Sequence, residues 1–521
     1  MRGGGGWRPR AIGALAAALG LLAAGCAAGH ETIPETPRPT TVATASSVAP
    51  VLPVAPTATP MPTPSVTPSP TLDRSRYAMT LTLDPAAKRL SGTVEVTLRN
   101  TSTTPWPAVC FRDWAASVLA LFGPPGLVSG VSAATDAASG RALTVRVDAT
   151  DPSVVFVDLA VPLAPGDVTT IALAYATDVP PGNQRLSWQA RPNGAQIVDL
   201  GNFYPVLAPY VDGQWVRHPF FQGGESFVSD CADYTVRLTL PDDFVVVSSG
   251  DEVKQPATGG LATWLVTANT VRDVAMAAAT GYASLMQTVA GVTVNSFYFT
   301  DSAKSKKLAE VMMQAAQLAL PAFDEAFGAY PYDELDLTQS DFFAAGMEYP
   351  SFIRIAASSA DWLTGSQSVG ALTTVAHEIA HQWFYAVVGN DQYDEAWLDE
   401  GFASYCSDVV FMSHYTSAKA VDDTFAGFLA DPNIKLSTPM ALNRSVAELD
   451  IEYTLVYFRG SVFLYDLEQA LGEPAFLAMM RDYYTSYSFK IATTADFLGV
   501  LARHSQGNQR VRDLIALNLA T

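Results

Sequence analysis

Two histidines and two glutamates in the segment 375–405 have the residue types and the spacing of a metal site. His377 and His381 lie four residues apart, so on a helix both imidazoles leave the same face and can reach one ion. Glu378 follows the first histidine, which places a carboxylate where it can take a proton from a metal-bound water. Eighteen residues separate Glu400 from His381, enough for the chain to turn and return a carboxylate from a second helix. The pattern predicts a Zn²⁺ site with His377, His381 and Glu400 as ligands and Glu378 as general base.

The alternative interpretation of an H-E-x-x-H match is a pair of histidines that only fill the protein core. Here the helix that would carry them has an apolar face, which we expect to be buried. A buried pair of histidines needs hydrogen-bond partners or a metal ion. The apolar residues are Leu372, Val375, Ala376, Ile379, Ala380, Trp383 and Phe384. Together with the downstream segment WLDEGFASY (397–405), this favours the metal site.

Length and charge limit the class of protein. A chain of 521 residues is long enough for two or three domains. Its net charge is -20 and no basic stripe stands out. Because a phosphate backbone is bound through clustered Lys and Arg, the sequence argues against a nucleic-acid partner. The sequence carries no signal of the oligomeric state.

The first 25 residues are predicted to be a signal peptide. Basic residues precede an apolar run at 11–24, which is too short to span a membrane comfortably. The run ends in LAAGC (22–26), which resembles a bacterial lipobox with Cys26 as the lipidated residue. We therefore expect export to the cell envelope, with acyl chains on Cys26 anchoring the protein to the outer face of a bacterial membrane. A plain secretory cleavage site, and so a secreted protein, is the alternative.

Three further segments follow along the chain. Residues 26–75 are rich in Pro, Thr and Ser and are predicted to be a disordered linker. Residues 76–285 alternate apolar and polar side chains between turn-forming residues, which predicts an all-β sandwich or saddle. From residue 302 the spacing becomes helical, with a short strand predicted at 335–340 and helices through the C-terminus. We therefore predict a mostly helical α+β domain over 286–521.

The cysteines allow one disulfide bond. If Cys26 is lipidated, Cys110, Cys231 and Cys406 remain, and export permits oxidation. Cys110 and Cys231 could pair, although spacing alone does not fix the connectivity. Cys406 is expected to be a small buried residue on the second helix of the metal site.

Taken together, these residues resemble the aminopeptidase N family of zinc peptidases, the gluzincins with a thermolysin-like catalytic domain. Because the chain ends at Thr521, the resemblance is to a short form without the family's large C-terminal helical domain, and a more open cleft is expected. It implies one zinc ion per chain, with Glu378 acting as base and then as proton donor to the leaving amine. The match is carried, in the family's order, by FGAYPYDEL (327–335), AAGMEYP (344–350), HEIAHQWF (377–384), WLDEGFASY (397–405) and YFRG (457–460).

The resemblance also implies two roles outside the metal ligands. Tyr457 would hydrogen-bond the oxyanion, with Tyr453, one turn earlier, as the rival assignment. Glu348 would pair with the free α-amine of a peptide, so that substrates are peptides with a free N-terminus. The chain departs from the family at Tyr349, where Asn is usual, and at Arg459, where Lys is usual. The first departure bears on strict exopeptidase character.

Three functions compete at this point. The first is an exported, membrane-anchored zinc aminopeptidase that hydrolyses the N-terminal peptide bond of peptides. The second is a zinc endopeptidase that uses the same site, favoured by Tyr349 and by an open cleft. The third is a surface binding or scaffold lipoprotein without catalysis. Glu378 argues against the third, because a purely structural site has no need of a base beside an open zinc position.

Overall fold

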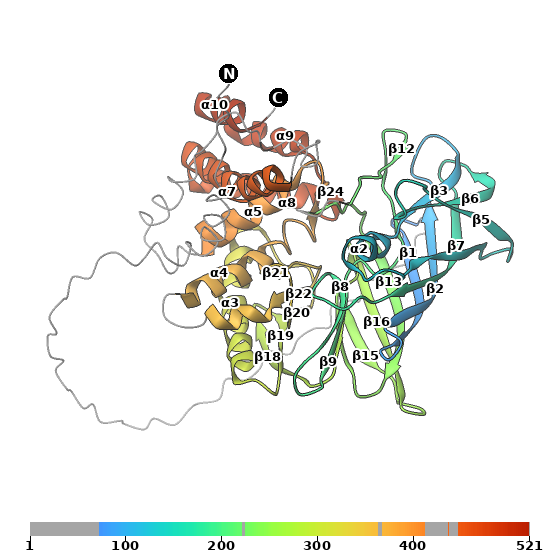
Figure 1. Cartoon of the computed structure of the whole chain (residues 1–521). Helices are drawn as coiled ribbons and strands as arrows, with labels where there is room; N and C mark the ends of the chain where they lie inside the picture. The colour runs from blue at the N-terminus through green and yellow to red at the C-terminus, as the bar shows by residue number, and fades with distance from the viewer. Residues whose placement is uncertain (1–71, 221–224, 363–366, 412–435, 437–445, 520–521) are drawn as a thin grey trace, which may run out of the picture. The chain divides into compact units, whose positions relative to one another are not determined.

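The computed structural model describes residues 72–220, 225–362, 367–411, 436 and 446–519 (Figure 1). The described residues from Asp73 onward belong to one compact unit, which carries everything described below. The predicted signal peptide, Cys26 and almost all of the predicted linker lie outside the described residues. Within the described part of the chain, no helix is both long enough and apolar enough to cross a membrane.

The first half of this unit is built from two β-sheets that share one apolar core. Strand β1 (Arg76–Asp84) shows the underlying pattern, because its exposed and buried residues alternate along its whole length. It pairs with β2 (Arg89–Arg99) in antiparallel and with β13 (Ala232–Pro241) in parallel orientation. Side chains of both sheets, such as Val236 and Met276, lie in the same core. This is the all-β domain that the sequence predicts.

The two sheets differ in size and in strand order. The larger runs β10 (Val206–Leu207), β3 (Trp106–Arg112), β6 (Val154–Leu163), β5 (Ala142–Val147), β4 (Ser129–Asp136), β7 (Val168–Asp178), β2, β1, β13, β16 (Leu261–Val271), β15 (Asp251–Lys254). The smaller runs β14 (Val245–Ser248), β17 (Met276–Ala279), β9 (Gln196–Leu200), β8 (Leu186–Ala190). A two-stranded ribbon, β11 (Tyr210–Val211) with β12 (Gln214–Trp215), and a helix α2 (Trp114–Phe122) complete this half. Helix α2 was not predicted from the sequence.

The second half combines a five-stranded sheet with helices. The sheet runs β18 (Tyr282–Val289), β19 (Val292–Phe299), β20 (Glu334–Ser340), β22 (Phe352–Ala356), β21 (Gly346–Met347). The helical elements are α3 (Ala303–Phe327), η1 (Ala357–Trp362), α4 (Gln367–Ala380), η2 (Ala396–Leu398), α5 (Glu400–Tyr405), the π-helix η3 (Cys406–Phe411), α7 (Val446–Leu471), α8 (Glu473–Tyr487), α9 (Thr494–Ser505) and α10 (Gln509–Asn518). Strands β23 (Val388–Gly389) and β24 (Lys490–Ile491) form a parallel pair.

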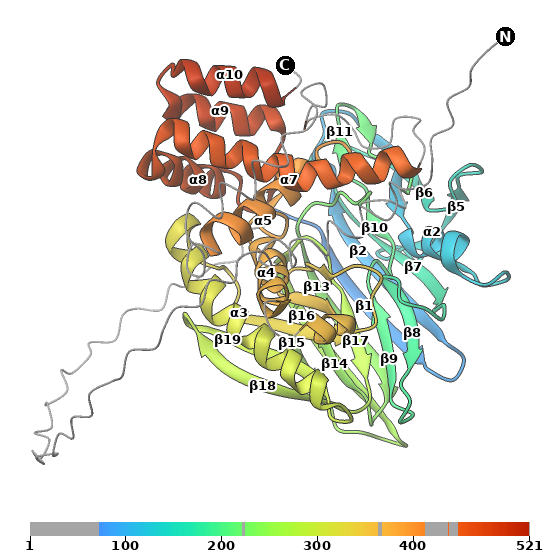
Figure 2. The same cartoon turned by 60° about the vertical axis from the view of Figure 1, so that its left-hand side comes forward.

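Helix α4 lies between the five-stranded sheet and the C-terminal helices. Helix α3 contacts β18 and β19, and α4 packs against α3, α5, β21 and β22. Figure 2 shows α8, α9 and α10 stacked beyond α5, on the side away from the five-stranded sheet. Helix α3 continues through Pro321, which lies at an exposed position and does not divide it. The fold is therefore an all-β domain followed by a mostly helical α+β domain, as predicted.

The bridge considered between Cys110 and Cys231 does not form. Both residues are free, buried thiols, and so is Cys406. Cys110 lies on β3, whereas Cys231 precedes β13, and six strands separate β3 from β13 in the order of the sheet. Cys406 is buried, as expected, but it begins the π-helix η3 directly after α5 instead of lying on α5 itself.

Candidate active site

The two histidines stand at the C-terminal end of α4. His377 lies in the last turn, and the helix ends at Ala380, so it is shorter than the apolar pattern through Phe384 suggested. His381 is the first residue beyond the helix, but its backbone N–H still donates to the His377 carbonyl at 3.3 Å. The four-residue spacing therefore keeps its helical geometry, and the two rings lie 4.8 Å apart between centroids.

Glu400 completes a compact set of three donors. It is the first residue of α5, and its Oε2 lies 3.2 Å from His377 Nε2 and 3.4 Å from His381 Nε2. The two Nε2 atoms are 3.1 Å apart. Ligand bonds of about 2.0–2.2 Å in a tetrahedral arrangement require donor atoms separated by about 3.3–3.5 Å. The three side chains therefore fit Zn²⁺ and leave one tetrahedral position for another ligand.

Neighbouring hydrogen bonds orient two of these donors. His381 Nδ1 lies 3.1 Å from the carbonyl oxygen of Phe384, so a proton on Nδ1 directs the free Nε2 lone pair toward the site. The N-cap Asp399 accepts a hydrogen bond from the Glu400 backbone N–H at 2.8 Å, and Gln392 donates to Asp399 at 3.0 Å. These contacts fix where α5 begins and therefore where its first carboxylate points.

A pair of glycines brings the tyrosine helix against the metal site. A Cβ on Gly401 would lie 2.9 Å from the Cα of Gly460, so α5 and α7 approach each other backbone to backbone. This contact places the hydroxyl of Tyr457 2.5 Å from Oε1 of Glu400, to which it donates. The Tyr457 ring also stacks on His377 at 5.7 Å. The side chain of the rival, Tyr453, lies outside the described residues.

Glu378 occupies the space left by another glycine. A Cβ on Gly346 in β21 would overlap the Glu378 carboxyl group, so the strand approaches the carboxylate closely only because this residue has no side chain. Burial raises the pKa of Glu378 to about 8, although the nearby His381 opposes the shift. The carboxyl group is therefore placed beside the three donors with a pKa suited to proton transfer near neutral pH.

Glu348 lies next to Glu378 with part of its carboxylate unpaired. It is 4% exposed, and its Oε1 has no hydrogen-bond partner among the described residues. Carboxylate oxygens of Glu348 and Glu378 and a ring nitrogen of His381 lie within 4.8 Å of one another. Burial, followed by the charge of Glu225, raises the pKa of Glu348 well above its usual range. A cation arriving beside Oε1 would relieve both effects.

The segment that carries Glu348 is attached to the end of α4. The side chain of Gln382 accepts a hydrogen bond from the Ser351 N–H at 2.8 Å and donates to the Tyr349 carbonyl at 3.2 Å. Tyr349 is buried, and its ring packs against Gly201 of the β domain and stacks on Phe352. The departure from the family at Tyr349 is therefore accommodated by Gly201.

Arg272 connects the β domain to the loop that follows His381. Its buried guanidinium donates to the carbonyl oxygens of Tyr385 at 2.8 Å, Val387 at 3.3 Å and Lys490 at 3.1 Å. Gly389 makes room for it, because a Cβ there would overlap the guanidinium. The sequence analysis missed Arg272, Gln382, Gly346 and the glycine pair, since none belongs to a periodic pattern near its partner. Gly346, Gln382, Gly401 and Gly460 lie inside the quoted motifs, whereas Arg272 lies outside them and carried no local signal.

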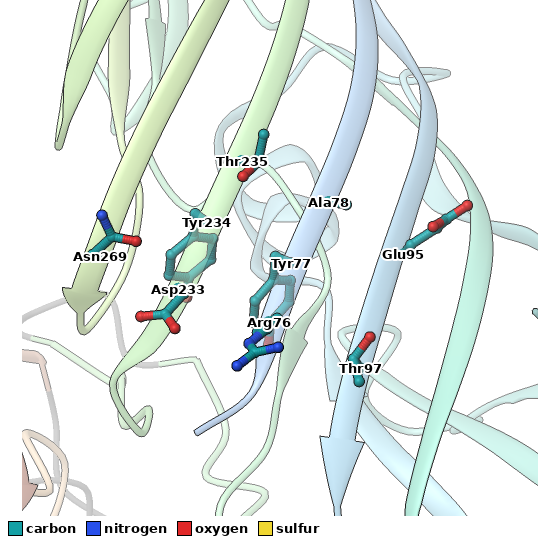
Figure 3. Close-up of a pocket in the computed structure, with 9 residues that line it drawn as sticks. All are labelled: Arg76, Tyr77, Ala78, Glu95, Thr97, Asp233, Tyr234, Thr235 and Asn269. Atoms are coloured by element: carbon teal, nitrogen blue, oxygen red, sulfur yellow. The ribbon is translucent and has the colours of Figure 1, made fainter. Parts of the chain in front are cut away.

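A separate hollow lies on the β domain (Figure 3). Its volume is about 270 Å³, and its lining includes Tyr77 and Tyr234, with Arg76 and Asp233 paired in register across β1 and β13. It contains none of the residues predicted for the chemistry. The candidate active site is therefore the cluster at the end of α4.

Comparison with known proteins agrees with this geometry. The model of the Peptidase family M1 domain matches residues 311–517. Aminopeptidase M1-B of Oryza sativa subsp. japonica is 27% identical over 299 residues, which cover 54% of this chain and 34% of the rice protein. Aminopeptidase N of Lactococcus lactis subsp. lactis is 29% identical over 147 residues, covering 25% of this chain and 16% of that protein. The chain thus spans about a third or less of the length of these curated relatives.

Solved structures cover much more of the chain. The M1 zinc metallopeptidase from Deinococcus radiodurans superimposes with a TM-score of 0.62 at 21% identity, over 86% of this chain and 94% of that protein. A variant of the same metallopeptidase bound to a Tyr-Ser-Ala substrate gives a TM-score of 0.60 at 20% identity, over 86% and 95% of the two chains. At these identities the likeness establishes the two-domain fold.

The β domain, the α+β domain and the His, His, Glu donor set together define a gluzincin-type metallopeptidase architecture. Residues 311–517 form a domain of peptidase family M1, which confirms the resemblance to the aminopeptidase N-like family inferred from the sequence motifs.

Proposed function

We propose that this protein is a zinc-dependent aminopeptidase that hydrolyses the N-terminal peptide bond of peptides. One observation carries the choice of substrate. Glu348 presents a buried, unpaired carboxylate oxygen beside Glu378 and His381, where the free α-amine of a peptide could enter. The relatives named above are aminopeptidases, which supports the same conclusion.

The metal ligands and Glu378 have separate roles in the reaction. Zn²⁺ on His377, His381 and Glu400 would supply Lewis acidity and an ionised water at neutral pH. The carboxylate of Glu378 accepts a proton from the attacking water and then donates it to the nitrogen of the leaving amine. Because a dication nearby favours the ionised carboxylate, the raised pKa of Glu378 would fall toward neutrality when the metal is bound.

Tyr457 stabilises charge on the substrate. Its hydroxyl lies 2.5 Å from Oε1 of Glu400, at the edge of the donor set, and the stacked His377 ring limits how far it can turn. A donor held there can hydrogen-bond the carbonyl oxygen on which negative charge develops. Glu348 meanwhile fixes the distance from the amine to the scissile bond, so that the first residue is released.

A test separates the proposed activity from its two rivals. The substrates are an amino-acyl arylamide, its N-acetylated form and an internally quenched peptide, each with and without a zinc chelator and with Glu378→Gln. We expect chelator-sensitive release from the free-amine substrate alone. Equal cleavage of the acetylated form would indicate an endopeptidase. The absence of cleavage in all three would leave a binding or scaffold protein.

The location in the cell is a second part of the proposal. The apolar run at 11–24 and the LAAGC sequence ending at Cys26 support export and lipid anchoring on the outer face of a bacterial membrane. The proline-rich residues 26–75 would then separate the folded unit from the bilayer. Fractionation tests this, because Cys26→Ala should move the protein from the membrane fraction to the soluble fraction without changing its activity. Equal partitioning of both forms would contradict the anchor.

A further inference from the structure

Tyr385, in the loop after the zinc-site helix, has a backbone conformation that residues with a side chain rarely adopt. Its φ is 133°, in the region that favours glycine, although its side chain is one of the largest. Such a conformation is strained, and it persists only where the surrounding contacts hold it in place. Tyr385 lies four residues after His381, so the contacts that hold this strain act beside one of the candidate metal ligands.

Two consecutive residues of the β domain hold Tyr385, one at its backbone and one at its side chain. The Arg272 guanidinium donates from Nε to the Tyr385 carbonyl at 2.8 Å, and the Tyr385 hydroxyl donates to Oδ2 of Asp273 at 2.9 Å. All three side chains are buried. The other oxygen of Asp273 is buried without a hydrogen-bond partner among the described residues. Removal of the tyrosine hydroxyl would therefore leave this carboxylate less satisfied still, and Tyr385 without its tether.

The conformation of Tyr385 determines the direction of the carbonyl group that contacts His381. The Phe384 carbonyl oxygen, 3.1 Å from His381 Nδ1, belongs to the same peptide group as the Tyr385 N–H. This N–H donates to the Val388 carbonyl at 2.9 Å. Because a peptide group is planar, the φ of Tyr385 sets how the whole group is turned relative to the tethered side chain. Relaxation of Tyr385 to an ordinary negative φ would turn the Phe384 carbonyl away from His381.

We propose that Tyr385 is a positioning residue for the zinc site. Asp273 of the β domain tethers it in the strained conformation, and in that conformation the Phe384 carbonyl holds the ring of His381 with Nε2 directed toward the metal. This inference rests on the zinc site of the proposed function. Loss of a partner that orients a metal-binding histidine typically lowers the metal affinity by about 10-fold to 100-fold. The β domain therefore contributes to zinc affinity without supplying a ligand.

Two substitutions of Tyr385 separate the tether from simple packing. Tyr385→Phe keeps the ring but removes the bond to Asp273, so the strained backbone is no longer held. Tyr385→Gly removes the ring as well, but glycine adopts the same φ without strain. We expect zinc affinity, measured on the full chain by competition with a chromogenic chelator, to fall by about 10-fold in Tyr385→Phe and by less in Tyr385→Gly. The Tm of the zinc-free proteins should rank in the opposite order, because Tyr385→Gly leaves a cavity.

Tyr175→Phe is the matched control. The Tyr175 hydroxyl donates to the buried carboxylate of Asp113 at 3.0 Å in the core of the β domain, so this variant loses a bond of the same kind. It should lower Tm and leave zinc affinity unchanged. Unchanged zinc affinity in Tyr385→Phe, a larger loss in Tyr385→Gly, or an equal loss in Tyr175→Phe would each overturn the role of Tyr385 alone. A wild-type protein that binds no zinc would overturn the zinc site, and this inference with it.

Discussion

The catalytic site and the group Glu252, Glu334 and Asp336 are two clusters of ionisable residues that differ in their donor atoms and in the elements that carry them. The catalytic site combines two imidazoles with one carboxylate, presented from the ends of α4 and α5. Glu252, Glu334 and Asp336 offer carboxylate oxygens only, from strands β15 and β20 of two different sheets. Glu252 and Glu334 are only partly buried, whereas Glu378, His381 and Glu400 are buried.

This difference separates function from stability. Residues of the catalytic site hold unsatisfied or strongly shifted groups, such as the orphan Oε1 of Glu348, that only a ligand relieves. Variants there should change rates and leave unfolding nearly unchanged. Glu252, Glu334 and Asp336 form a group apart from the predicted catalytic residues, so variants there should change stability and leave rates nearly unchanged.

Glu378→Gln should have the largest effect on activity. The amide keeps the shape of the side chain against Gly346 but cannot accept the proton, so we expect kcat to fall by about 10³-fold or more. Zinc content should stay at one per chain. Tm should not fall, because a buried charge is removed.

The matched control is Glu310→Gln on the exposed face of α3, where the carboxylate pairs with Lys307. It should leave kcat unchanged. A Glu378→Gln enzyme that retains more than about a tenth of wild-type kcat would show that another group acts as the base.

Tyr457→Phe should lower kcat by about 10²-fold to 10³-fold, the loss typical of removing one donor to a developing oxyanion. KM for an amino-acyl arylamide should change little, because the hydroxyl acts on charge that develops after binding. Steady-state kinetics on zinc-loaded protein measure both constants. An equal rise in KM with unchanged kcat would instead assign Tyr457 to substrate binding.

The sequence predicted the parts of the site that local geometry determines. His377, Glu378 and His381 were found because a helix places residues four apart on one face. Glu400 followed from its spacing after His381, and Tyr457 and Glu348 followed from the resemblance, since each lies in a stretch similar to the family. The division into an all-β and an α+β domain was predicted from the change in the spacing of apolar residues, from alternation to helical spacing. The helix α2 was missed because its nine residues lie among strands.

Long-range contacts could not be predicted from the sequence. Gly401 and Gly460 touch although 58 residues lie between them, and a glycine in a helix has no local signal for a partner. Arg272 binds backbone carbonyls, which every residue carries, so no residue type marks its partners. The approach of Glu252 to Asp336 could not be predicted either, because it depends on the packing of two sheets.

Glu348→Gln should discriminate between substrates. The ion pair with an α-amine contributes on the order of 2 kcal/mol, so kcat/KM for a free-amine substrate should fall by about 30-fold. The N-acetylated substrate should show no further loss. Comparison of kcat/KM for the two substrates measures the effect, and an equal loss on both would place Glu348 in support of the metal site instead.

Gly460→Ala should reduce stability more than any change in the catalytic ligands. The new Cβ would lie 2.6 Å from the Cα of Gly401, so α5 and α7 must move apart. We expect a loss of about 1–3 kcal/mol in the free energy of unfolding, measured by urea denaturation. Activity should also fall, because the separation moves Tyr457 from Glu400. Gly499→Ala in α9, where a Cβ would meet open space, is the matched control and should be neutral or stabilising.

Arg459→Lys should have the smallest effect. Arg459 donates from Nε to Asn518 Oδ1 at 3.1 Å and from a terminal nitrogen to the Leu517 carbonyl at 3.2 Å, which joins α7 to the end of α10. A lysine is a flexible point charge and cannot make both bonds in the same geometry. We expect a loss of about 1 kcal/mol in unfolding free energy with kcat unchanged. A fall in kcat at unchanged stability would contradict this, because it would show that Arg459 acts through Tyr457, two residues earlier on α7, and not through the C-terminal helix.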